Sequence, residues 1–108
     1  MENGYAVILT TAADQTQAQE LAALLVEQRL AACVQMLPIY SCYRWKGQVM
    51  NDEEILLLIK TRADLYEEVE AFIKEHHSYE VPEIIQLPVQ QGSKPYLNWI
   101  ITNTKGEP

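Results

Sequence analysis

The sequence predicts an α+β domain in which four strands and two helices alternate in the order β-α-β-β-α-β, followed by a C-terminal helix. Two segments have helical periodicity and begin at capping residues, and the segments around them are rich in β-branched and aromatic residues. One of these strand segments is apolar at both parities. With 108 residues, the chain is expected to form a single domain over residues 1–108.

The first part of the chain predicts one strand and one helix. Residues 4–11, GYAVILTT, are apolar and β-branched, which favours a strand. Asp14 stands three residues before Gln17, the spacing of a capping box, and predicts a helix that runs to about Leu30. Apolar residues then recur at helical spacing, so the helix has one apolar face: Ala18, Leu21, Ala22 and Leu25.

A β-hairpin is predicted next. Residues 32–45, ACVQMLPIYSCYRW, and residues 48–61, QVMNDEEILLLIKT, both indicate strands, and Lys46-Gly47 indicates the turn between them. Pro38 cannot donate a hydrogen bond to a neighbouring strand. The first of the two strands is therefore expected at an edge of the sheet, or with a bulge at the proline.

The second part of the chain predicts a helix, a strand and a terminal helix. Asp64 and Glu67 form a second capping-box pattern, and that helix ends near His76-His77. Residues 83–90, EIIQLPVQ, predict the last strand, and Ser93 with Pro95 predicts the start of the helix PYLNWIITN. This order is the split βαβ, ferredoxin-like arrangement, an antiparallel sheet with both helices on one face.

The apolar run at residues 55–59, ILLLI, requires cover on both faces of its strand. Two helices cover one face of a small sheet, so we expect a second copy of the chain on the other. The terminal helix is apolar nearly all round, and we expect it to dock against a neighbouring subunit.

Charge and composition exclude several classes of function. The net charge of −7, from 15 acidic and 8 basic residues, repels phosphate backbones, so we expect no nucleic-acid binding. No apolar run approaches the ~20 residues that span a bilayer, and the N-terminus lacks the basic start of a signal peptide. We expect a cytoplasmic protein without membrane insertion, whose two cysteines, Cys33 and Cys42, are buried free thiols.

The side chains with the most chemical potential gather in residues 76–85, HHSYEVPEII. Adjacent histidines diverge on a helix, so at most one of them points into a given pocket. His76 suits a helix C-terminus, where carbonyls are unpaired, whereas His77 fits a helix end and a ligand site equally well. No nucleophile stands with a base and no glycine-rich phosphate loop is present, so we do not expect an enzyme.

Several stretches resemble the CutA family, named for tolerance to divalent cations: AACVQMLPIYSCYRWKG, EEILLLIKT, HSYEVPEII and PYLNWI. The similarity runs from Ala6 to about Thr102. It implies a tight homotrimer of ferredoxin-like domains, similar in architecture to the P-II signalling proteins. It also implies binding of divalent metals, copper above all, without an established catalytic activity. In animals the family has been linked to the anchoring of acetylcholinesterase in membranes.

The resemblance also implies a site in the clefts between subunits. Cys33 matches the cysteine of the family's AAC segment and, with His77, is the implied metal ligand. No second cysteine lies near the HSYE loop, so the ligand chemistry favours weak binding of Cu²⁺ or another divalent cation by imidazole and carboxylate. The residues implied for a bound small molecule are Lys60, Tyr79, Glu80, Trp45 and Tyr43.

Packing roles compete with ligand roles at these positions. Lys60 ends the apolar strand and fits either a ligand contact or a surface position, and Tyr43 and Trp45 fit packing in the core or between subunits. Three functions stay open: a homotrimeric divalent-cation (copper) binding or tolerance protein, a P-II-like regulatory module that binds an anionic ligand in intersubunit clefts, and a trimeric scaffold for another protein.

Overall fold

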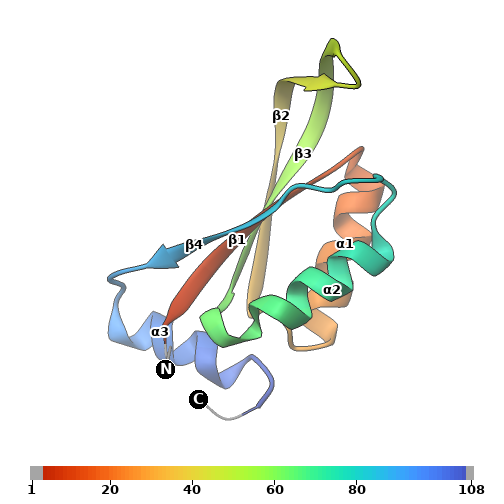
Figure 1. The fold of residues 1–108 in the computed structure, drawn as a ribbon. Helices are drawn as coiled ribbons and strands as arrows, with labels where there is room; N and C mark the ends of the chain where they lie inside the picture. Colours follow the sequence, from red (N-terminus) through yellow and green to blue (C-terminus); the bar gives the residue numbers. More distant parts are fainter. Residues whose placement is uncertain (1–3, 107–108) are drawn as a thin grey trace.

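The computed structural model describes residues 4–106 as a four-stranded antiparallel sheet with two helices packed on one face (Figure 1). The strand order is β2-β3-β1-β4. The predicted α+β fold with its extra C-terminal helix is confirmed. The elements are β1 (Tyr5–Ala12), α1 (Gln15–Glu27), β2 (Cys33–Trp45), β3 (Gln48–Arg62), the 3-10 turn η1 (Ala63–Leu65), α2 (Tyr66–His76), β4 (Ile84–Val89) and α3 (Lys94–Thr102).

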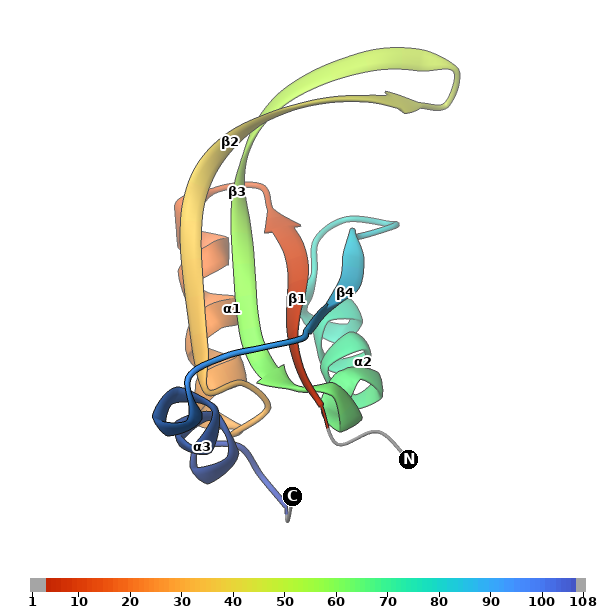
Figure 2. The same ribbon diagram turned by 90° about the vertical axis from the view of Figure 1, so that its left-hand side faces the viewer.

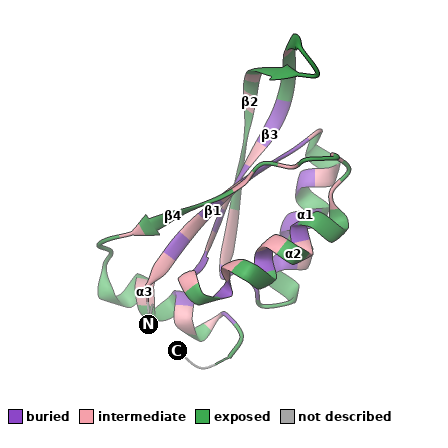
Figure 3. Cartoon of the chain, viewed as in Figure 1, coloured by how far each residue is buried: buried purple, intermediate pink, exposed green. Residues whose placement is uncertain are grey.

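The core lies between the sheet and the two helices α1 and α2, which cover the same face (Figure 2). Alternate strand residues point to this side, and Ile8, Leu57 and Ile59 are completely buried there. The helices contribute Leu25 and Val69 to the same cluster. Figure 3 shows the buried residues concentrated at this interface, whereas β4 and the end of the β2–β3 hairpin are exposed.

The opposite face of the sheet is apolar and largely uncovered. Helix α3 lies across one end of it, where Lys60 Nζ stands 5.8 Å from the ring centroid of Tyr96. Elsewhere Leu37, Ile85 and Leu87 remain 45%, 48% and 47% exposed. We call this surface the open sheet face: Leu9, Leu37, Leu58, Ile85 and Leu87.

The β2–β3 hairpin extends beyond the other strands (Figures 1 and 2). β1 pairs with β3 only as far as Ala12 and Ile55, and from there to the turn β3 pairs with β2 alone. Lys46 and Gly47 have φ angles of 51° and 82°, the left-handed values that a two-residue type I′ turn requires. The predicted turn is confirmed, as is the edge position of the proline-containing strand.

Three local expectations are wrong. α1 ends at Glu27 rather than near Leu30, because Arg29 adopts the left-handed conformation (φ 60°) that terminates helices. Asp64 does not cap α2: it pairs with the nearly buried Arg62 at 3.0 Å, since a buried guanidinium needs a carboxylate partner.

The third concerns the thiols. Both cysteines are free, but Cys33 is half-buried and Cys42 is exposed, because β2 is an edge strand that continues into the projecting hairpin. Within residues 4–106, no helix has the length and apolarity needed to cross a bilayer.

The buried hydroxyl of Thr10 generates a stability prediction. Thr10 and Thr61 are both fully buried, but Thr61 donates to Leu30 O at 2.7 Å, whereas Thr10 Oγ1 has no partner among the described residues. We expect Thr10→Val to raise the free energy of unfolding by about 1 kcal/mol, because it removes an unsatisfied buried group. The same change at Thr61 should lower it by about 1 kcal/mol, because it removes a bond.

Urea unfolding at one fixed protein concentration measures both variants. Equal shifts of the two midpoints in the same direction would contradict the assignment of the two hydroxyls.

Candidate functional site

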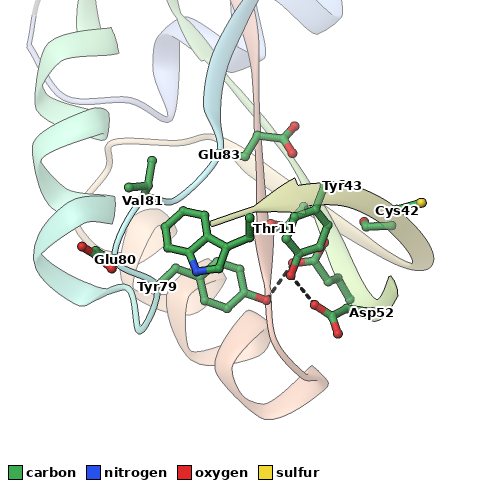
Figure 4. Close-up of a pocket in the computed structure, with 11 residues that line it drawn as sticks. Thr11, Cys42, Tyr43, Asp52, Tyr79, Glu80, Val81 and Glu83 are labelled. Carbon is green, nitrogen blue, oxygen red and sulfur yellow. Dashed lines mark hydrogen bonds between the residues drawn. The ribbon is translucent and has the colours of Figure 1, made fainter. Parts of the chain in front are cut away.

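A cavity of 670 Å³ opens where the β2–β3 hairpin leaves the body of the sheet (Figure 4). Its aromatic residues are Tyr43 and Trp45 of β2 and Tyr79 of the loop at residues 77–83. We call it the acidic pocket, because β3 and the same loop supply four carboxylates to its lining: Asp52, Glu54, Glu80 and Glu83.

The register of the hairpin brings the first aromatic and acidic side chains together. Tyr43 pairs directly with Met50, which places Asp52 at the diagonal position on the same face. The Tyr43 hydroxyl donates a hydrogen bond to Asp52 Oδ2. This bond, with a smaller effect of desolvation, raises the pKa of Tyr43, so the phenol keeps its proton.

His77 attaches the loop at residues 77–83, which closes the acidic pocket, to the end of β1. Its Nε2 lies 2.5 Å from Thr11 O at the end of β1, and its Nδ1 lies 3.0 Å from the backbone nitrogen of Tyr79. A carbonyl only accepts and a backbone N–H only donates, so the ring is neutral with its hydrogen on Nε2. Neither nitrogen has a free lone pair, and metal binding by His77 would require both bonds to break.

Tyr79 continues the connection from the loop to β3. Its hydroxyl donates to Glu54 Oε2 at 2.7 Å, and Glu54 is only 8% exposed. Burial first, and then the bond to Glu54, raise the pKa of Tyr79 well above its ordinary value. Figure 4 shows the rings of Tyr43 and Tyr79 converging on the carboxylates of β3.

The pocket is negatively charged without a basic residue in its lining. No lysine, arginine or histidine lines it, and none of its four carboxylates forms an ion pair within residues 4–106. Lys46, at the hairpin turn, stands 5.7 Å from the centroid of the Trp45 ring. Such a surface attracts cations and repels anions.

The structure brings together only part of the predicted site. Four of the residues predicted to bind a small molecule line the acidic pocket together: Tyr43, Trp45, Tyr79 and Glu80. Lys60 lies at the other end of the sheet beside α3, so one chain cannot hold an anion between Lys60 and Tyr79.

The two predicted metal ligands are also separated. Cys33 pairs with Lys60 at the α3 end of the sheet, whereas His77 adjoins the pocket. Across the part of the chain that the structure describes, no group of three or more histidine, cysteine or acidic side chains is placed to hold a metal ion.

Sequence reasoning missed Asp52 and Glu54. A signal for them existed: they share the parity of Leu56 and Leu58, and the Lys46-Gly47 turn fixes which β2 residues they face. The strand register was therefore sufficient to place Asp52 diagonal to Tyr43 and Glu54 two residues further along the same face.

Fold and pocket together define a small ferredoxin-like α+β protein with an acidic, aromatic-walled cavity. The sequence model of the family described as "CutA1 divalent ion tolerance protein" matches residues 6–103. The chain therefore belongs to the CutA1 family.

Relatives and solved structures agree with this assignment. The "Divalent-cation tolerance protein CutA" of Thermus thermophilus is 43% identical over 99 residues, covering 91% of this chain and 96% of the relative. "Protein CutA" of Mus musculus is 46% identical over 91 residues, 83% of this chain but only 51% of the mouse protein. The crystal structure of CutA1 from Shewanella sp. SIB1 superposes with a TM-score of 0.93 at 36% identity, covering 98% of this chain and 100% of that one.

Tyrosine ionisation tests the two phenol–carboxylate bonds. Of the six tyrosines, we expect Tyr43 and Tyr79 to ionise above the ordinary phenol pKa of 10.0. Tyr79→Phe should remove one late-ionising phenol from an ultraviolet absorbance titration. Glu54→Gln should move the pKa of Tyr79 only part of the way back, because burial is the larger cause.

The raised pKa of Tyr79 also affects the stability of the protein at high pH. Because the pKa of Tyr79 is raised in the folded state, this phenol contributes stability that is fully present below its unfolded pKa of about 10. The contribution is lost as the pH rises from there through the folded pKa. Tyr79→Phe should flatten the alkaline loss of unfolding free energy. If the unfolding free energies of wild type and Tyr79→Phe depended on alkaline pH in the same way, the raised pKa of Tyr79 would be contradicted.

Proposed function

We propose that this protein binds divalent cations weakly in the acidic pocket, as a homotrimer, and that it acts by binding rather than by catalysis. One observation carries the proposal: four carboxylates line a single cavity whose lining contains no lysine or arginine. Carboxylate oxygens are the usual protein ligands of hard divalent cations. Relatives that cover nearly the whole chain carry the name divalent-cation tolerance protein, which supports the same class of ligand.

The absence of a converged ligand set explains why we propose weak binding. A tight metal site needs several ligands that meet at one point. Here Asp52 and Glu54 each already accept a hydrogen bond from a phenol, while Glu80 and Glu83 lie on the exposed loop. The pocket therefore attracts a cation through its summed charge rather than by a fixed coordination shell.

The homotrimer is proposed from the open sheet face. Apolar side chains that remain nearly half exposed on a sheet face form a contiguous patch of the kind that marks an interface. Cyclic closure with three copies gives every copy the same cover and leaves no patch free. The acidic pocket lies on the same side of the sheet, so neighbouring chains approach its rim.

Copper is the finer part of the proposal, and it requires Cys33 and one histidine with an available ring nitrogen. Cys33 supplies the soft sulfur that copper favours. His77 is less suited, because both of its ring nitrogens are hydrogen-bonded. His76 uses only Nδ1, toward Phe72 O at 2.9 Å, so it is the histidine whose Nε2 is available.

A ligand-binding module is the second candidate, favoured by the dimensions of the pocket. Its 670 Å³ lies within the range of roughly 300–1,000 Å³ typical of small-molecule sites. An anionic ligand is disfavoured by the four carboxylates.

Calorimetric titration tests the proposed function with matched variants. We expect Mn²⁺ and Cu²⁺ to bind wild type weakly, and Glu54→Gln to weaken Mn²⁺ binding several-fold because it removes the most buried charge. Glu53→Gln makes the same change of charge at the alternate position of β3, facing away from the pocket, and should bind Mn²⁺ like wild type.

The histidines and the cysteine separate the copper sites. Any imidazole contribution to Cu²⁺ binding should disappear in His76→Ala and persist in His77→Ala, and Cys33→Ser should remove the sulfur contribution. Mn²⁺ binding that is absent from wild type, or unchanged in Glu54→Gln, would contradict the pocket as the cation site.

A further inference from the structure

We infer that the acidic pocket is a binding site for an organic ammonium ion, a protonated amine that carries an apolar or aromatic body. The inference deepens the proposed function and rests on it in one respect: it uses the same pocket and the same negative charge. It differs in the chemical class of the cation.

The acceptors of the pocket also suit an N–H donor. Asp52 Oδ2 and Glu54 Oε2 each accept from a tyrosine hydroxyl, which fixes both carboxylates and leaves the second oxygen of each for a ligand. A primary ammonium group carries three N–H donors and no acceptor, which suits a pocket that offers free carboxylate oxygens. Charge-assisted bonds of this kind are about twice as strong as neutral ones.

The aromatic residues give the site a second feature that a metal ion does not use. Tyr43, Trp45 and Tyr79 all line the cavity, and the faces of such rings attract organic cations. The protein already contains one example, since the Lys46 ammonium stands 5.7 Å from the centroid of the Trp45 ring. A ligand ammonium in the cavity would meet the same kind of surface.

Volume and depth determine how such a ligand would lie. A cavity of 670 Å³ is far larger than a single metal ion requires, and it accommodates an organic body. Glu54 is 8% exposed, whereas Asp52, Glu80 and Glu83 are exposed. The ammonium group is therefore expected at Glu54, where the charge is most shielded from water, with the apolar body against Trp45 and Tyr43.

A series of three probes with one phenethyl body isolates the charge. Phenethylammonium is a cation, phenethyl alcohol is its neutral counterpart, and hydrocinnamate is an anion of similar shape. Each is titrated into the full-length protein in an amine-free buffer at neutral pH. Calorimetry measures affinity, and NMR amide shifts locate the site.

We expect phenethylammonium to bind about tenfold or more tightly than phenethyl alcohol, since charge-assisted bonds add over a kilocalorie per mole. Hydrocinnamate should not bind. Glu54→Gln and Trp45→Leu should each weaken phenethylammonium binding by about tenfold. Glu53→Gln and Tyr40→Leu, which make comparable changes on the other face of the hairpin, should leave the affinity as in wild type.

Equal affinities for the amine and the alcohol would overturn the inference, as would amide shifts that map outside the pocket. Unfolding midpoints and particle mass, compared for each variant, show that a lost affinity does not arise from a lost fold. The two proposals fail separately. Mn²⁺ binding without phenethylammonium binding overturns this inference alone, whereas phenethylammonium binding without Mn²⁺ binding supports it and overturns the metal proposal.

Discussion

The arrangement of the whole chain depends on β3, a strand that is apolar on both of its faces. Toward the helices, Leu57 and Ile59 are completely buried and hold α1 and α2 against the sheet. Toward the other side, Leu56 and Leu58 are only partly covered within one chain. A two-sided strand loses part of its hydrophobic stabilisation unless something packs on its second face. We therefore propose that β3, which forms the core of one chain, also lies in the interface with other copies.

The acidic pocket begins where this apolar pattern ends. Beyond Ile55, β3 loses its neighbour β1 and its side chains on the open side become Glu54 and Asp52. Carboxylates are tolerated there because two tyrosine hydroxyls bond to them and because they line a cavity rather than the packed core. The loop at residues 77–83 closes the site. It is held in place by His77, whose ring is hydrogen-bonded to β1 and to the backbone of Tyr79. The two histidines therefore have different roles. His76 lies at the end of α2, and His77 attaches the loop at residues 77–83 to β1.

Patterns with a short range were predictable from the sequence. Asp14 caps α1 through a 2.9 Å bond to the Gln17 nitrogen, and Lys46-Gly47 forms the hairpin turn, because these structures depend on a few adjacent residues. The predicted helix cap at Asp64 does not form, because Arg62 binds this carboxylate instead. Arg62 is itself buried by the C-terminal segment. That competition depends on contacts between residues distant in sequence.

The candidate site was predictable only in part for the same reason. Tyr43, Trp45, Tyr79 and Glu80 were identified, and they do meet in one cavity. Lys60 and Cys33 are predicted to line clefts between subunits, and within one chain the strand direction places them at the opposite end of the sheet from the pocket. The bond of His77 to Thr11 was not predictable, because the two residues are distant in the sequence.

Small-angle X-ray scattering over a dilution series tests the central claim that β3 requires cover from other copies. We expect the mass of three chains down to low concentration. We also expect Leu87→Glu, on the open sheet face, to dissociate the particle because a carboxylate cannot be buried there. The matched change Val26→Glu, at a residue of α1 with a similar exposure of 43%, should leave the trimer intact. A wild-type particle with the mass of one chain and a radius of gyration near 14.4 Å would show that β3 needs no cover from other copies.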